Sequence, residues 1–143
     1  MKYRQTHIPK VNISDRLKNC TASELREFVK THYANHLQGH AVVNDDLKFE
    51  IRFTAQGKNK LSKGGSIYSK KAALVTILKE IVKHAEYSNF KPRKATDPLE
   101  LSGYFNFKAK VKIDGVIQSI RFSALIYRDG KIYYNHEVSI QKK

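Results

Sequence analysis

Hydrophobic residues recur along this chain with two different periods, and these periods predict its helices and strands. From residue 22 to 37 they return every three or four positions, which is the spacing of an amphipathic helix. Thr21 and Glu24 can form a capping box at its start, and Gly39 can end it. A second stripe predicts a helix from about 69 to 87, with apolar residues at Leu74, Ile77, Leu78, Ile81, Val82 and Ala85.

Alternating apolar and polar residues predict strands in much of the remaining chain. The strands are expected at 40–43, 47–54, 102–113, 116–127 and 131–140. In the second of these, Phe49, Ile51 and Phe53 would share one face. Asp114-Gly115 and Asp129-Gly130 predict tight hairpin turns that join the last three strands.

Together these elements predict an α+β fold. Two helices would pack on one face of an antiparallel sheet of four or more strands, and the C-terminal part of that sheet would be a three-stranded meander. The segment 88–101, which contains two prolines, is expected to be a loop. Residues 1–20 are expected to form a basic N-terminal arm, and residues 21–143 a single α+β domain.

The chain is strongly basic, with 27 Lys and Arg against 13 Asp and Glu, a net charge of +14 and a pI near 9.9. This charge favours a nucleic-acid partner first and an anionic membrane surface second. No apolar run approaches the roughly 18 residues that a membrane-spanning helix needs. The N-terminus lacks the apolar core of a signal peptide, and the single Cys20 excludes an internal disulfide. We therefore expect a cytoplasmic protein with no membrane partner.

Basic residues are concentrated between Ile51 and Lys79, where seven of them occur without any Asp or Glu. Inside this stretch the loop 57–66 leads into the second predicted helix, where backbone amides and the helix dipole can hold phosphate. Lys70 and Lys71 fall in the first helical turn, where stability alone would favour acidic residues. An anion site and a solvated lysine loop both agree with this pattern, and a Walker motif is absent. The lysines of the loop are Lys58, Lys60 and Lys63.

A second basic group is predicted on the polar face of the sheet. It comprises Lys108, Lys110 and Lys112 of one strand and Ser119, Arg121 and Ser123 of the next. With Tyr104 and Tyr127 at its margins, such a face could grip a single-stranded backbone and stack a base. The alternative is the ordinary solvent-facing side of a half-buried sheet.

Three histidines are candidates for chemistry. His32 and His36 lie one helical turn apart, but no HExxH motif and no third ligand completes a zinc site, so we expect neither a metal nor a cofactor. His136, on the last predicted strand, could act as a general acid or base because an imidazole titrates near neutral pH. Its parity matches that of Tyr134 and Val138, which favours burial instead.

Several segments follow one another in an order that resembles a known nuclease superfamily. They are Leu37-Gln38-Gly39-His40-Ala41-Val42-Val43, Phe49-Glu50-Ile51-Arg52-Phe53-Thr54, Gly57-Lys58-Asn59-Lys60, the helix 71–85 and the two Asp-Gly hairpins. Over residues 37–141 the chain resembles the barnase/EndoU/colicin/RelE-like nuclease superfamily, in particular the domains of phage and mobile-element polyvalent proteins and polymorphic toxins. The resemblance implies a small helical layer on a four-stranded antiparallel sheet, and metal-independent cleavage of RNA.

The resemblance also implies site residues. The lysine that follows the first strand in the superfamily matches Lys60 best, with Lys58 beside it. The later strands would supply the remaining groups from Arg121, Ser123, Tyr134 or His136. The chain departs from better-known members in lacking a clear two-histidine or Glu–Arg–His set. A non-catalytic nucleic-acid-binding module is therefore the alternative to a nuclease.

The leading hypothesis is a metal-independent RNA endonuclease of the toxin or phage type. The ribose 2′-OH would attack the adjacent phosphorus and produce a cyclic phosphate, with Lys60 and Arg121 stabilising the phosphate. His136 would transfer protons, and Tyr134 would substitute for it or stack on a base. RNA, with tRNA as one candidate, would be bound by Lys58, Lys63, Lys70, Lys71, Lys108, Lys110 and Ser123.

An acidic immunity or inhibitor protein is a second expected partner, because basic toxins are neutralised by acidic proteins that cover the substrate groove. A toxin of this kind could be delivered into a target cell rather than act in the cytoplasm that made it.

Overall fold

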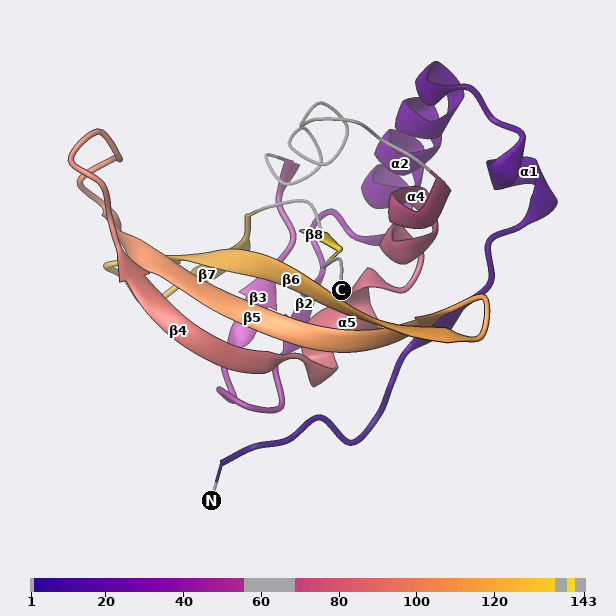
Figure 1. Ribbon diagram of the computed structural model, residues 1–143. Coiled ribbons are helices and arrows are strands. Elements are labelled where there is room, and N and C mark those ends of the chain that lie inside the picture. Colours follow the sequence, from indigo (N-terminus) through magenta and orange to yellow (C-terminus); the bar gives the residue numbers. More distant parts are fainter. Residues whose placement is uncertain (1, 56–68, 136–138, 141–143) are drawn as a thin grey trace.

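The computed structural model describes residues 2–55, 69–135 and 139–140, and within these ranges it contains four labelled helices and eight strands (Figure 1). The helices are α1 (Asp15–Lys18), α2 (Ala22–His36), α4 (Ser69–Val75) and α5 (Leu78–His84). The strands are β1 (Lys10–Val11), β2 (Ala41–Val43), β3 (Glu50–Arg52), β4 (Glu86–Pro92), β5 (Leu101–Ile113), β6 (Val116–Tyr127), β7 (Ile132–Tyr134) and β8 (Ser139–Ile140). The predicted α+β class is confirmed.

The eight described strands form one curled sheet, in the order β1-β5-β6-β7-β3-β2, with β4 also paired to β5 and β8 to β6. Its centre is the β5–β6 hairpin, whose antiparallel ladder extends over residues 101–113 and 116–127. Asp114 and Gly115 both have positive φ (49° and 82°), as a type I′ turn requires. The consecutive strands β5, β6 and β7 confirm the predicted C-terminal meander.

The sheet is mixed, whereas an antiparallel sheet was predicted. β1 runs parallel to β5, with Lys10 opposite Lys112, and β3 runs parallel to β7, with Ile51 opposite Ile132. Both parallel pairs join segments that are far apart in the sequence. No hairpin turn sets their direction, so local turn signals could not reveal them.

The first predicted helix is confirmed as α2. The Glu24 amide donates to Thr21 Oγ1 (3.2 Å) and the Thr21 amide donates to Glu24 Oε1 (2.9 Å), which completes the capping box. Beyond the C-terminal end of the helix, Gly39 has a φ of 84°, a conformation that glycine adopts without strain.

The second predicted helix, 69–87, is interrupted and ends early. It is divided into α4 and α5 at Thr76 and Ile77, whose amides donate to carbonyls three residues back (both 3.1 Å). The Thr76 hydroxyl also donates to the Ala73 carbonyl (2.6 Å), and such a bond competes with regular helical pairing.

The prediction of a loop at 88–101 is wrong for its first part, because residues 86–92 form strand β4, which pairs with the edge of β5. Pro92 stands at the last position of this edge strand, where a missing amide is tolerated.

Phe49 does not share the buried face of Ile51 and Phe53, although the alternation of this segment predicted that it would. It precedes β3, follows Lys48 with its φ of 64°, and is 55% exposed.

The last predicted strand, 131–140, appears as β7 and β8, which both pair with β6. Residues 136–138 between them lie outside the described residues. The structure therefore describes two parts of the predicted strand, residues 132–134 and residues 139–140.

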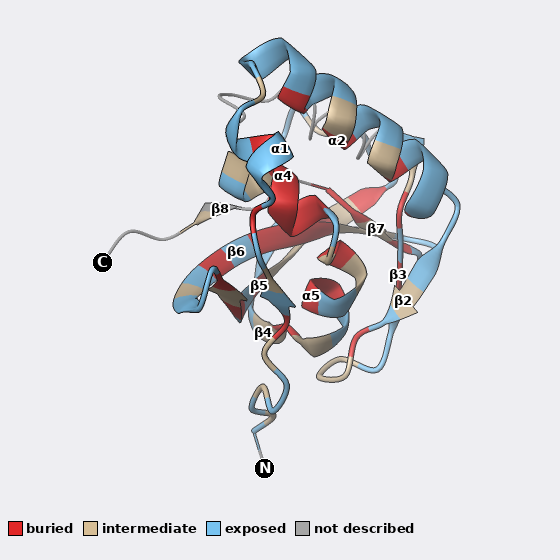
Figure 2. Ribbon diagram, turned by 90° about the vertical axis from the view of Figure 1, so that its right-hand side faces the viewer, coloured by how far each residue is buried: buried red, intermediate tan, exposed pale blue. Residues whose placement is uncertain are grey.

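The hydrophobic core lies between the helices and one face of the sheet (Figure 2). Its largest buried side chains include Tyr33, Phe53, Phe107 and Tyr134. The described helices lie on this side of the sheet, so the opposite face of β5 and β6 is free of them; we call it the helix-free face (Figures 1 and 2). Among the described residues, no helix is long and apolar enough to cross a membrane.

Candidate nucleic-acid interface

The N-terminal arm is fastened to the edge of β5 by the side chain of Gln5. The Lys110 amide donates to Gln5 Oε1 (2.8 Å), and Gln5 Nε2 donates to the Lys110 carbonyl (2.8 Å). This pair of bonds occupies the interval between β4, whose pairing with β5 reaches Lys108, and β1, whose pairing begins at Lys112. The Gln5 side chain thus satisfies the backbone amide and carbonyl of Lys110, as the backbone of a neighbouring strand would.

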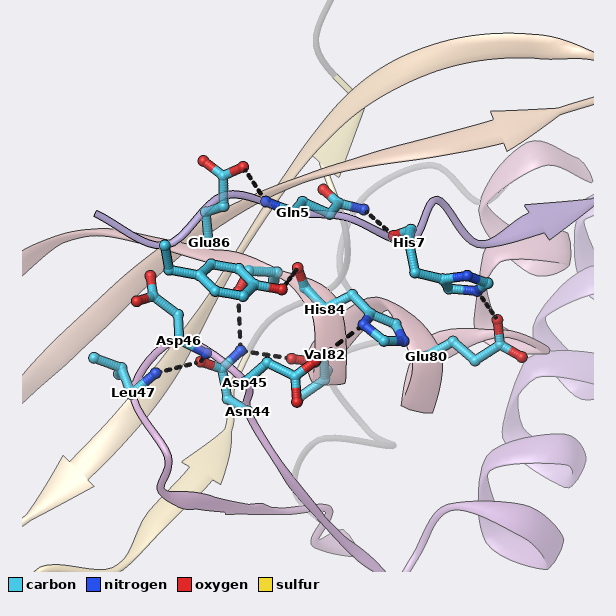
Figure 3. A network of polar contacts seen from close by, with 12 residues as sticks. Gln5, His7, Asn44, Asp45, Asp46, Leu47, Glu80, Val82, His84 and Glu86 are labelled. Carbon is cyan, nitrogen blue, oxygen red and sulfur yellow. Dashed lines mark hydrogen bonds and ion pairs between the residues drawn. The ribbon is translucent and has the colours of Figure 1, made fainter. Parts of the chain in front are cut away.

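Further polar contacts hold the arm against the end of α5 and the start of β4 (Figure 3). The Gln5 amide donates to Glu86 Oε2 (2.9 Å), and the Tyr3 hydroxyl donates to the carbonyl of His84 (3.2 Å). His7 Nε2 lies 3.6 Å from Glu80 Oε2. The residues expected to form a basic arm therefore pack along the domain between residues 2 and 11.

A groove runs between this arm and the helix-free face, and we call it the arm groove. Its volume is about 540 Å³. Among the described residues it is lined by Lys2, Tyr3, Arg4, Gln5, Glu86, Lys108, Ala109, Lys110, Ser119, Ile120 and Arg121. Five of these side chains are basic and one is acidic, so the groove is suited to an anionic ligand.

The basic residues of the groove are placed next to one another by strand register. Lys108 lies directly opposite Arg121, and Lys110 lies opposite Ser119. Lys108, Lys110 and Arg121 are exposed, and within the described part of the chain none of them makes an ion pair. Like charges directly opposite each other destabilise an antiparallel pair. A bound anion would remove that repulsion.

Glu86 is the acidic residue of the groove. It pairs with Lys108 across β4 and β5, so a single row across the sheet contains Glu86, Lys108 and Arg121 in that order. One oxygen of its carboxylate accepts the Gln5 amide. The row thus presents a proton acceptor beside two cations on one surface.

The comparison with protein families shows to which family the chain belongs. The family model of the large polyvalent protein-associated domain 3 matches residues 21–134. The chain belongs to this family. Searches of curated proteins and of solved structures found no significant match.

The family match covers most of the arm groove. It begins at the capping box of α2, ends with β7 and includes β4, β5 and β6. Lys2, Arg4 and Gln5 precede it, so the arm's share of the groove comes from outside the matched part of this polyvalent protein-associated domain.

Four residues of the basic group predicted on the sheet meet in the arm groove of this family member, namely Lys108, Lys110, Ser119 and Arg121. Lys70 and Lys71 lie in the first turn of α4, as predicted, but they do not line the groove. Lys58, Lys60, Lys63 and His136 lie outside the described residues, and their predicted roles stay predictions.

Two other predicted site residues of the polyvalent-protein domain lie inside it. Tyr134 is 1% exposed, and its ring packs in the core 5.5 Å from that of Phe53 and 5.9 Å from that of Phe122. Ser123 is 7% exposed, and Asn135 Nδ2 donates to its hydroxyl (3.4 Å). These positions point to internal packing rather than contact with RNA.

The three other charged residues of the groove, Lys2, Arg4 and Glu86, were not among those predicted from the sequence. The arm has no strong periodicity from which its docking through Gln5 could have been predicted. Residue 86 was expected to lie in a helix. The alternation of β5 could have suggested that the edge of this strand needs a partner.

The helical histidines of this family member are close together but incomplete as a metal site. The rings of His32 and His36 are 4.5 Å apart, and burial together with the neighbouring His36 lowers the pKa of His32. In the described ranges no group of three His, Cys, Asp or Glu residues could hold a metal ion.

Proposed function

We propose that this polyvalent protein-associated domain binds RNA in the arm groove and cleaves it without a metal ion. The observation that carries the proposal is the exposed Lys108–Arg121 pair, neither member of which makes an ion pair among the described residues. Lys110 lies two residues further along β5, about 7 Å from Lys108. Successive phosphates of one strand could therefore contact successive cations of the groove.

The same row offers groups for the chemistry of cleavage. In the proposed reaction the 2′-oxygen forms a bond to phosphorus, the bond from phosphorus to the 5′-oxygen breaks, and a cyclic phosphate results. Glu86 would accept the 2′-OH proton, and Lys108 and Arg121 would stabilise the negative charge on the phosphate. His136, predicted from the sequence as a proton-transfer group, would then act as the acid that protonates the leaving oxygen.

The second candidate function is RNA binding without cleavage. It is favoured by the composition of the groove, because no histidine is among its described lining residues. Both functions predict binding that weakens steeply with salt. Only the nuclease predicts a cyclic phosphate product.

The test is incubation of the purified protein with end-labelled single-stranded RNA in excess EDTA. We expect fragments that carry a 2′,3′-cyclic phosphate. RNA that is bound but stays intact would overturn the cleavage proposal and leave the binding module. RNA that is neither bound nor cut would overturn both.

Two variants separate the roles of the groove residues. Arg121→Gln should weaken RNA binding, whereas Lys30→Gln, at an exposed position on α2, serves as the matched control. Glu86→Gln keeps an acceptor for the Gln5 amide but removes the proton acceptor, so it should reduce turnover far more than affinity. His136→Ala tests the predicted acid in the same assay.

The acidic immunity or inhibitor protein belongs to the same proposal. An acidic partner would cover the arm groove and compete with RNA for Lys108, Lys110 and Arg121. Binding of such a partner should weaken in Arg121→Gln to a degree similar to the loss of RNA binding.

A further inference from the structure

A cluster of three tyrosines lies on the helix-free face, beyond the arm groove. Tyr104 of β5 lies opposite Leu125 of β6, which in turn lies opposite Tyr133 of β7. The rings of Tyr127 and Tyr133 are 5.4 Å apart and nearly perpendicular. All three tyrosines are partly exposed, so their rings are accessible to a ligand.

The cluster shares a face with the basic row. Lys108 and Tyr104 are four positions apart on one strand, so both point to the same side of the sheet, about 13 Å apart. At the roughly 3.4 Å rise of a stacked strand this distance is about four base steps. One nucleic-acid strand could therefore place phosphates in the groove and bases on the tyrosines.

The Tyr104 side chain is held by a hydrogen bond from its hydroxyl. Its hydroxyl donates to Asp97 Oδ2 (2.7 Å), and the same carboxylate oxygen accepts the amide of Lys94 (2.8 Å). The hydrogen bond to Asp97 raises the pKa of Tyr104, while the bonds from the Lys94 amide and then from the Tyr104 hydroxyl lower the pKa of Asp97. A ring held in this way loses little conformational freedom when a base stacks on it.

Cations also flank the tyrosines. Lys91 lies opposite Tyr104 on β4, and Arg52 lies opposite Tyr133 on β3; both are exposed. Arg52 is 3.2 Å from Glu50, at an exposed position where the ion pair contributes little. Aromatic platforms interleaved with cations are the arrangement by which proteins bind single strands.

We infer that Tyr104, Tyr127 and Tyr133 stack the unpaired bases of an RNA strand whose phosphates lie in the arm groove. The substrate class is therefore single-stranded RNA, since paired bases in a duplex cannot lie flat on a side chain. This inference rests on the proposed function, because it uses the same groove for the phosphates. It assigns to the tyrosines the part of the binding that depends on bases.

The test compares two oligonucleotides, each eight nucleotides long and 2′-O-methylated so that the protein cannot cleave it through the 2′-OH. One carries all its bases, and the other has the same backbone without bases. The wild-type protein should bind the complete chain more tightly, by about 5- to 140-fold for each base that stacks. Tyr133→Leu should lower this ratio towards one and leave the affinity for the baseless chain unchanged.

Two controls make the outcome decisive. Tyr133→Phe keeps the ring and should keep the ratio, while retained affinity for the baseless chain shows that a variant is folded. An unchanged ratio in both Tyr133→Leu and Tyr127→Leu would overturn the stacking site while the groove stands. If the wild-type protein binds neither chain, the proposed function itself fails.

Discussion

Lys108 of β5 and Arg121 of β6 lie directly opposite each other, exposed and without an ion-pair partner in the described part of the chain. Two like charges directly opposite each other on neighbouring strands cost stability. The pair becomes favourable when a phosphate lies between the two side chains. Stability and binding should therefore respond in opposite directions when one charge is removed.

The first prediction follows from this opposition. Arg121→Gln should raise the free energy of unfolding slightly, by about 0.2–1 kcal/mol, because the repulsion with Lys108 disappears. The same variant should weaken RNA binding and reduce the salt slope by about 0.7. Urea denaturation and a salt series of binding isotherms measure the two effects. A variant that loses stability, or that binds like Lys30→Gln, would contradict the assignment.

A second prediction concerns the attachment of the arm. Gln5→Ala removes both bonds to the backbone of Lys110, which leaves that part of the β5 edge without its partner. The Lys110 amide should exchange its hydrogen faster, and RNA affinity should fall because Lys2 and Arg4 are no longer held beside the groove. Gln38→Ala, at an exposed site after α2, is the control. Unchanged exchange at Lys110 would show that the arm is held by other contacts.

A third prediction concerns Asn44, which is fully buried in the turn after β2 (Figure 3). Its Nδ2 donates to the carbonyls of Val82 (2.8 Å) and Ala85 (3.0 Å), and its Oδ1 accepts the amides of Asp46 (3.1 Å) and Leu47 (2.9 Å). Asn44→Ala removes two buried and two partly buried hydrogen bonds and should cost about 3 kcal/mol or more.

Denaturation by urea measures this loss, and Asn12→Ala, at an exposed position, should change stability by less than about 0.5 kcal/mol. A loss in Asn44→Ala as small as that of the control would mean that water replaces the side chain.

The elements that local physics determines were the ones that could be predicted from the sequence. The capping box at Thr21 determines the start of α2, and the turn residues Asp114 and Gly115 determine the β5–β6 hairpin with its exposed cations. Both signals act over four residues or fewer. They are sufficient to place Lys108 and Arg121 on adjacent strands.

The elements that depend on distant partners could not be predicted in this way. The amphipathic pattern of residues 69–87 continues through the break at Thr76, and a strand at 86–92 becomes favourable only because the edge of β5 is there to pair with it. The groove itself required the arm, which is held in part by one glutamine amide bonded to a backbone 105 residues away in the sequence. Side-chain pairing of this kind has no periodic signature.

The last prediction concerns pH and the bond between Tyr104 and Asp97. The pKa of Asp97 is lowered first by the Lys94 amide and then by the Tyr104 hydroxyl. Because the folded-state pKa is depressed, the stability that Asp97 contributes is present above its unfolded pKa and is lost as the pH falls through the folded value. Tyr104→Phe should raise the pKa of Asp97 but leave it below its usual value, because the bond from Lys94 remains.

Carboxyl ¹³C shifts of Asp97, followed by NMR from pH 7 down to about pH 2, measure this change directly. The titration midpoint of Asp97 should move upward in the variant. If the Asp97 midpoint stays where it is in the wild type, the Tyr104 hydroxyl does not hold the carboxylate. The ring of Tyr104 would then be free to turn, and it would no longer offer a fixed surface for a base.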